Sequence, residues 1–258
     1  MSSSNPQYWQ PGEDFLQNSL HFPSFEELPR EGELVKTYWK QQGKKKAAPT
    51  PACTWFFMGE IINDEFSQMN FLHNRVLVCD RDDQDNIPIA FYPKTGFMDY
   101  KLLKNCNTIF VASAQKHKFL DSTVGLRVED LNTVSIAPCT MEEMFTLSQT
   151  YHDCKETRCW WCGVGVCPSC LAAGRTSACG PGAGEEAGGL KKCSACKVAR
   201  YCSKECQYLD WKEGGHKWCC KAMPIFLKLT KINYTKFDTT ALLGPAHFIP
   251  GLLNCKKS

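Results

Sequence analysis

Cysteines are concentrated in one part of this chain, because twelve of the 17 lie between Cys154 and Cys220. Within that part, candidate ligands follow the spacings Cys-x2-Cys, Cys-x3-Cys and His-x3-Cys. A two-residue gap lets two thiolates of one tight turn reach one metal ion, and residues four apart lie on one face of a helical turn. Eight such ligands fit two tetrahedral zinc sites. The candidate ligands are Cys159, Cys162, Cys193, Cys196, Cys202, Cys206, His216 and Cys220.

Metal binding explains these cysteines better than disulfide bonding does. Residues 1–6 are polar and lack the basic and apolar segments of a secretory signal, so we expect an intracellular protein whose thiols stay reduced. The sequence leaves nucleus and cytoplasm equally open. No apolar run approaches the roughly 18 residues of a membrane span, so no membrane association is expected. In so small a module, zinc would supply much of the folding free energy, on the order of 10 kcal/mol per structural site.

The part before the cysteine cluster predicts a small antiparallel β domain, so the fold class is α+β. The chain has 258 residues and is 43% hydrophobic, enough for one ordinary core and a smaller unit. Short β-branched and aromatic runs alternate with turn residues, which is typical of strands. A helix expected at 96–103, between the third and fourth runs, makes an OB-like barrel possible. The runs are residues 54–62, 75–79, 87–92, 108–112, 124–128 and 134–137.

Composition divides the chain into four parts. Thr140 and Glu143 form a capping box, in which each side chain accepts a hydrogen bond from the backbone amide of the other residue. This box predicts a helix from Thr140 to about Tyr151 that leads into the cysteine cluster. The apolar residues after Cys220 predict a tail that packs back onto the protein. The expected parts are a poorly ordered extension (1–53) with a short helix at 33–39 and a basic linker at 43–51, a β-rich domain with its flanking helix (54–153), a zinc-binding part (154–220) with a Gly-rich insertion at 164–192, and the tail (221–258).

The stretch Cys193–Gln207, followed by Asp210-Trp211 and His216, resembles the body of a MYND-type zinc finger. The resemblance covers residues 159–220 and implies two interleaved sites. Segments of residues 54–140, such as 58–62 and 121–130, also resemble the part that precedes the finger in fungal MYND proteins. In the implied pairing, one zinc ion is bound by Cys159, Cys162, Cys202 and Cys206, and the other by Cys193, Cys196, His216 and Cys220.

Spacing alone leaves several groupings open. A sequential grouping would also give one site of four cysteines and one of three cysteines and a histidine. Because an insertion separates the first two ligand pairs, Cys167 and Cys170 compete with Cys159 and Cys162 as the first pair, although the run from Cys159 to Gly163 favours the latter. Cys219 could replace Cys220, whose spacing fits better. A third, incomplete site would contain Cys167, Cys170 and Cys179.

Binding rather than catalysis is the function that these patterns favour. Thiolates in closed zinc sites are not free nucleophiles, and the chain has no Gly-rich phosphate loop or nucleophile elbow, so we expect no enzyme and no small-molecule substrate. The resemblance implies an adaptor or regulatory protein whose finger receives proline-containing peptides. Gln207 and Trp211 are the expected contact residues, because both belong to a helix that zinc would hold in place.

Nucleic-acid binding is the alternative function. A net charge of +3 creates no strong global field that would attract a polyanion. An OB-like domain could still bind single strands through exposed aromatic residues and so serve a transcriptional regulator. The candidates are Phe91, Tyr92, Phe97 and Tyr100, for which burial in the core is the competing interpretation.

Overall fold

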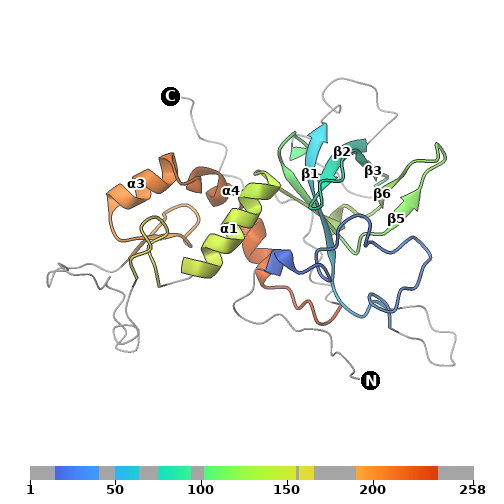
Figure 1. Ribbon diagram of the computed structural model, residues 1–258, viewed down its shortest axis with the longest axis horizontal. Helices are drawn as coiled ribbons and strands as arrows, with labels where there is room; N and C mark the ends of the chain where they lie inside the picture. Colours follow the sequence, from blue (N-terminus) through green and yellow to red (C-terminus); the bar gives the residue numbers. More distant parts are fainter. Residues whose placement is uncertain are drawn as a thin grey trace.

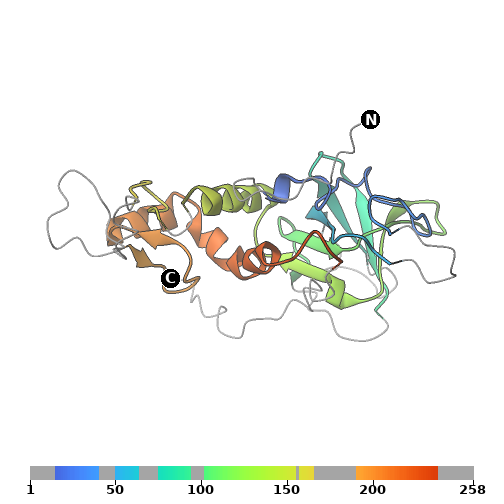
Figure 2. The ribbon, with the colours of Figure 1, turned by 90° about the horizontal axis from the view of Figure 1, so that it is seen from below.

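The computed structural model describes residues 15–40, 50–63, 75–93, 102–154, 157–165 and 190–237. Figure 1 shows the β domain at one end, the cysteine-rich part with helix α3 (Lys204–Lys212) at the other, and two helices between them. These are α1 (Met141–Cys154) and α4 (His216–Thr230), and the view in Figure 2 confirms their place between the two ends. Among the described helices, none is both long and apolar enough to cross a bilayer.

A seven-stranded mixed sheet forms the β domain, with the strand order β5-β6-β3-β2-β1-β4-β7. All six predicted strands are present, and the short strand β5 was not predicted. The predicted α+β fold class is confirmed, and pairing is antiparallel except between β3 and β6, whose parallel pairing makes the sheet mixed. The strands are β1 (Phe56–Asn63), β2 (Arg75–Asp80), β3 (Ile87–Phe91), β4 (Thr108–Ala112), β5 (Lys116–Lys118), β6 (Val124–Val128) and β7 (Val134–Ala137).

The sheet curls because a short link joins β6 and β7, two strands that are separated by four others in the strand order. β6 pairs with β3 and β7 pairs with β4, yet only residues 129–133, including the 3-10 turn η4 (Leu131–Thr133), separate β6 from β7. This path brings the last strand back across the sheet to its other edge. Gly125 permits the parallel pairing, since a Cβ at that position would lie 2.1 Å from the Pro88 carbonyl oxygen.

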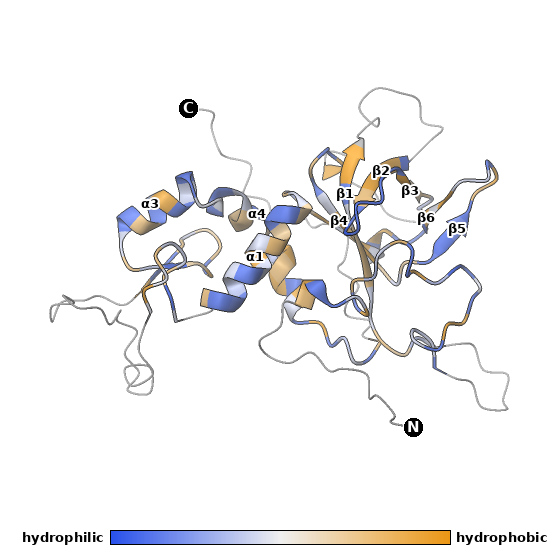
Figure 3. Cartoon of the chain, in the orientation of Figure 1, coloured by the Kyte–Doolittle hydropathy of each residue, from blue (hydrophilic) through white to orange (hydrophobic). Residues whose placement is uncertain are grey.

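Alternation along the strands creates two cores. On β1, Phe57 and Ile61 face a core inside the curled sheet, whereas Phe56 and Met58 face a second core outside it. Every residue of β4 is buried because this strand is covered on both faces. The outer core continues through α1 and α4 into the cysteine-rich part. In Figure 3, β1 and β2 are mainly hydrophobic, whereas α3 is mainly hydrophilic.

The amino-terminal part departs from the sequence prediction. Residues 15–39 are not a poorly ordered extension, because apolar side chains spread among polar ones fill both cores; they include Phe15, Leu16, Phe22 and Phe25. The helix expected at 33–39 is only a turn, closed by bonds from the amides of Tyr38 and Trp39 to Val35 O, both 3.0 Å. Tertiary packing overrides the helical pattern, since the rings of Tyr38 and Trp39 pack against Trp55. Most of the helix expected at 96–103 lies outside the described residues.

Helix α1 begins with the predicted capping box. The Thr140 amide donates to Glu143 Oε2 at 2.8 Å, and the Glu143 amide donates to Thr140 Oγ1 at 3.1 Å. The capping box therefore satisfies two backbone donors at the start of the helix. The prediction of this helix is confirmed, and the helix extends to Cys154, three residues beyond the expected end.

Loss of the cap is expected to weaken the chain measurably. Thr140→Ala removes the acceptor for the Glu143 amide and should lower the free energy of unfolding by about 1 kcal/mol. Urea denaturation of the zinc-loaded protein would measure this. Thr146→Ala, an exposed position in the same helix, is the matched control, and it should cause no loss because alanine is the better helix former. Equal losses in the two variants would contradict the capping role.

Candidate metal centre

The first group of ligands combines a turn with the start of a helix. Cys159 and Cys162 belong to a turn closed by the bond from the Gly163 amide to Cys159 O, 2.9 Å. Cys202 lies two residues before α3, and Cys206 lies in its first turn. The four sulfur atoms lie within 4.8 Å of one another, with 3.6 Å between Cys162 and Cys202 and 3.4 Å between Cys202 and Cys206.

The second group combines a hairpin with helix α4. Cys193 and Cys196 occupy the turn between β8 (Lys191–Lys192) and β9 (Arg200–Tyr201), and His216 and Cys220 lie one turn apart on α4. The ligand atoms again lie within 4.8 Å of one another. Cys193 Sγ is 3.9 Å from Cys220 Sγ, and Cys196 Sγ is 3.8 Å from His216 Nε2.

These spacings fit tetrahedral zinc. With zinc–sulfur bonds of about 2.3 Å, the sulfur atoms at the corners of a tetrahedron are separated by roughly 3.8 Å. The measured separations of 3.4–3.9 Å agree with that value and far exceed the roughly 2.05 Å of a disulfide bond. Each group supplies four ligands, so the chain has two closed sites for two zinc ions.

Neighbouring thiols of the second group compete for ionisation. The pKa of Cys193 is lowered because the thiols of Cys196 and Cys220 donate to its sulfur. The pKa of Cys220 is raised because its proton is held in the bond to Cys193. The thiolate of Cys193 is therefore favoured at the expense of that of Cys220, and a bound dication would favour both thiolates together.

The first group shows the same competition between neighbouring sulfur atoms. Burial opposes ionisation of Cys159, but backbone amides of Cys162 and Cys202 donate to its sulfur and lower its pKa. The pKa of Cys202 is raised, first by burial and then by its hydrogen bond to Cys206. The backbone thus favours the thiolate of Cys159, and a bound zinc ion would favour the thiolate of Cys202 beside it.

Aromatic rings fix the histidine ligand. The rings of Trp160, Tyr201 and Trp211 surround the His216 imidazole edge to face, at centroid distances of 5.8–5.9 Å. Tyr201 in turn donates its hydroxyl to Asp210 Oδ2 at 2.7 Å, and burial raises the pKa of Asp210. This packing holds the imidazole with Nε2 toward Cys196, while Nδ1 is buried without a hydrogen-bond partner among the described residues.

The structure brings the eight predicted ligands together in the interleaved arrangement, not the sequential one. Cys219 belongs to neither group: its thiol points to Glu143 O, 4.0 Å away. Cys202 does not lie on a helix as expected, because Ser203 caps α3 and leaves Cys202 outside it. The competing candidates Cys167, Cys170 and Cys179 lie outside the described residues.

The predicted contact residues share one face of α3. Gln207 is half-buried, and Trp211, one turn later, is 38% exposed. Trp211 therefore contacts the histidine ligand with one edge and solvent with another, so it does not fill the core. Three other aromatic residues of the cysteine-rich part are exposed, Trp161, Tyr208 and Trp218, and none of them was predicted as a contact residue. The ammonium groups of Lys217 and Lys221 both lie over the ring of Trp218. The basic residues near Trp218 in the sequence, Lys217 and Lys221, could have indicated that this tryptophan is exposed.

Comparisons with known proteins identify this part of the chain. Residues 159–220 match the family model described as MYND finger. Similar proteins include "SET domain-containing protein 14" of Caenorhabditis elegans, 62% identical over 34 residues, which are 13% of this chain and 8% of that protein. "Ubiquitin carboxyl-terminal hydrolase 19" of Arabidopsis thaliana is 64% identical over 31 residues, 12% of this chain and 4% of that protein. The matches thus span less than a tenth of either relative. No solved structure matches, and the resemblance to fungal proteins stays a prediction.

Proposed function

We propose that this chain, whose residues 159–220 form a MYND zinc finger, is a regulatory or adaptor protein that binds partner peptides through the finger. The finger is a zinc-binding module of the protein-interaction type. The observation that carries the proposal is the position of Trp211, which packs against the ligand His216 and remains 38% exposed.

An aromatic side chain held in this way suits peptide recognition. Its conformational freedom is already restricted by the zinc site, so little entropy is lost when a peptide packs on it. A proline ring can stack on the exposed indole, and the Gln207 amide can bond a peptide backbone group beside it. Proline-containing segments lose little entropy themselves, because their backbone is already extended.

The ligand sets support binding over catalysis. Catalytic zinc sites keep a position for water or substrate, whereas each group here provides four protein ligands. The cysteines are therefore committed to structure and leave zinc no position for substrate. We accordingly propose that the chain is not an enzyme.

Replacing the exposed tryptophan tests the proposal. The zinc-loaded chain is first screened against an array of proline-containing decapeptides. The affinity of the peptide that binds most strongly is then measured by fluorescence anisotropy. Trp211→Ala should weaken binding at least 30-fold, since a central aromatic contact typically contributes about 2 kcal/mol or more. Trp218→Ala removes another exposed tryptophan and is the matched control, with little expected effect. Undiminished affinity of Trp211→Ala, at full zinc content, would refute this contact site.

Nucleic-acid binding through the β domain has weaker support. Of the aromatic candidates, Phe91 is buried and Tyr92 is 48% exposed, with Arg127 over its ring. The nearby guanidinium groups of Arg75 and Arg127 already pair with carboxylates, that of Asp121 and that of Glu129, both at 2.7 Å. These acids reduce the attraction for phosphates. Phe97 and Tyr100 lie outside the described residues.

A further inference from the structure

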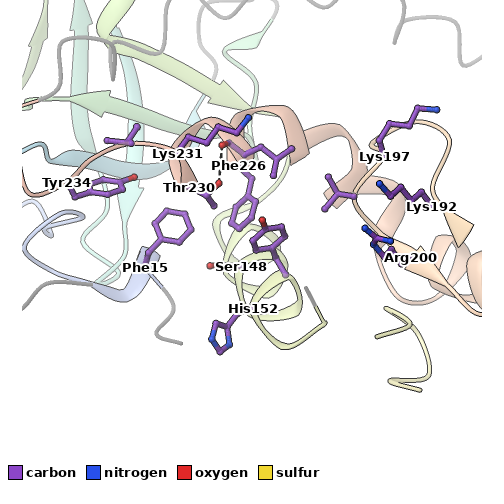
Figure 4. A pocket seen from close by; sticks show the side chains of 14 residues that line it. Phe15, Ser148, His152, Lys192, Lys197, Arg200, Phe226, Thr230, Lys231 and Tyr234 are labelled. Carbon is purple, nitrogen blue, oxygen red and sulfur yellow. Dashed lines mark hydrogen bonds between the residues drawn. The ribbon is translucent and has the colours of Figure 1, made fainter. Parts of the chain in front are cut away.

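A groove of about 590 Å³ lies where the finger meets the rest of the chain. Its lining comes from the amino-terminal turn η1 (Phe15–Gln17), from α1, from the β8–β9 hairpin, and from α4 with the residues that follow it. Figure 4 shows the labelled side chains, with Phe15 and Tyr234 toward one end and Lys192, Lys197 and Arg200 toward the other. Neither Gln207 nor Trp211 lines it, so it is separate from the proposed peptide site on α3.

One end of the groove is apolar. The ring of Phe226 packs against Phe15 at 5.6 Å and against Tyr151 at 5.1 Å, which gives the groove a rigid aromatic floor. Leu227 and Ile232 line it as well and are only half-buried. Apolar surface that its own fold leaves partly uncovered favours contact with an apolar side chain of another molecule.

The other end is cationic. Lys192 and Lys197 are exposed and Arg200 is half-buried beside them, whereas Lys231 lies near Tyr234, away from this end (Figure 4). Among the described residues that line the groove, none is acidic. The groove therefore combines an apolar floor with a positive end, and its complement is a ligand with an apolar part and a negative part.

We propose that this groove is a second peptide-binding surface, specific for an extended segment that carries a bulky apolar residue followed or preceded by acidic residues. The apolar residue packs between the half-buried side chains of Leu227 and Ile232, above the buried ring of Phe226, and the carboxylates face Lys192 and Lys197. Several lining residues, such as Phe15 and Tyr151, lie outside residues 159–220. The surface is therefore a property of the whole chain and not of its finger alone, and it would let the chain bind two different segments at once.

Labelled decapeptides of defined chemistry test the proposal with the full, zinc-loaded chain. The probe carries one phenylalanine and three neighbouring glutamates, and its counterparts carry glutamines for the glutamates or a serine for the phenylalanine. Anisotropy should show binding of the probe, at least tenfold weaker binding of either counterpart, and weakening with added salt.

Variants of the chain locate the site. The double change Lys192→Glu and Lys197→Glu should weaken probe binding at least tenfold, whereas Lys204→Glu with Lys217→Glu, an equal charge change on the finger outside the groove, should leave it intact. Ile232→Gln should also weaken probe binding, because it removes an apolar contact for the phenylalanine of the probe. Trp211→Ala should not affect the probe, so failure of this site and failure of the α3 site are distinguishable.

Four results would overturn the proposal. Equal affinities of the glutamate and glutamine peptides would show that charge does not contribute to binding. Equal losses of affinity in the two double variants would show that the lysines attract the acidic probe only nonspecifically. Binding of decanoate without any binding of the probe would assign the groove to a small amphipathic anion. Self-association that the Lys192 and Lys197 changes abolish, again without probe binding, would assign it to a second copy of the chain.

Discussion

Removal of zinc is expected to unfold the finger and to release α4 from the β domain, while the core inside the curled sheet persists. Structural zinc contributes on the order of 10 kcal/mol per site, so its loss exceeds what so small a module can offset. The loss of structure should extend beyond the ligands. Three of the ligands, Cys159, Cys193 and Cys220, belong to the same apolar cluster as Phe56 and Phe226. The inner core contains none of the predicted ligands.

Amide hydrogen exchange of the chelator-treated chain would measure this. Protection should be lost in residues 157–165 and 190–230 and retained in β1 to β4. Cys106→Ser, at an exposed cysteine outside both groups, is the matched control and should behave as the unmodified chain. Exchange that chelation leaves unchanged would contradict the structural role of the metal.

Metal analysis completes this test by asking which cysteines bind. The unmodified chain should hold two zinc ions, and a chain with Cys159→Ser and Cys162→Ser should hold one. A chain with Cys167→Ser and Cys170→Ser should keep both. The opposite result would place the first ligand pair in the insertion and would overturn the grouping seen in the structure.

Local patterns explain what could be predicted from the sequence. The strands were predictable because each is a short apolar run with turn residues on both sides, and α1 was predictable because Thr140 and Glu143 stand three residues apart. Ligand spacing is equally local, since two thiolates of one turn must reach one ion. The order of strands, by contrast, depends on contacts between distant residues, and the parallel pairing of β3 with β6 left no sign in either segment.

The amino-terminal part shows why the remaining features could not be predicted. Phe15, Leu16 and Phe22 follow no helical or strand period, so composition alone indicated disorder. In the structure they are held by Arg81, whose guanidinium donates to Leu16 O and Phe22 O from 65 and 59 residues away in the chain. Interleaving of the zinc sites is a similar case, because two groupings have the same local spacings and only family resemblance or coordinates distinguish them.

The same cluster of apolar residues gives the chain its two proposed binding surfaces. Zinc orients α3 and thereby Trp211, and it also fixes the start of α4, whose later turns carry Phe226 and Leu227 into the groove. A substitution of Phe226 should therefore change both the free energy of unfolding and the shape of the groove. Such a substitution is the strongest test of the connection between the finger and the β domain.

Phe226→Ala is expected to lower the free energy of unfolding by about 3–5 kcal/mol, the usual cost of removing a buried phenylalanine ring. The side chain is fully buried and packs on both Phe15 and Tyr151, so the variant leaves a cavity between α4, α1 and the amino-terminal turn. Urea denaturation at a fixed excess of zinc would measure the change, since metal binding otherwise shifts the apparent stability.

An exposed aromatic residue on the same helix is the control for this variant. Trp218 is 44% exposed, and Trp218→Ala should lower the free energy of unfolding by less than about 1 kcal/mol. A loss for Phe226→Ala no larger than that of Trp218→Ala would show that α4 does not connect the finger to the β domain. A large loss confined to the finger, with exchange protection of the strands unchanged, would show that the two parts are connected but unfold separately.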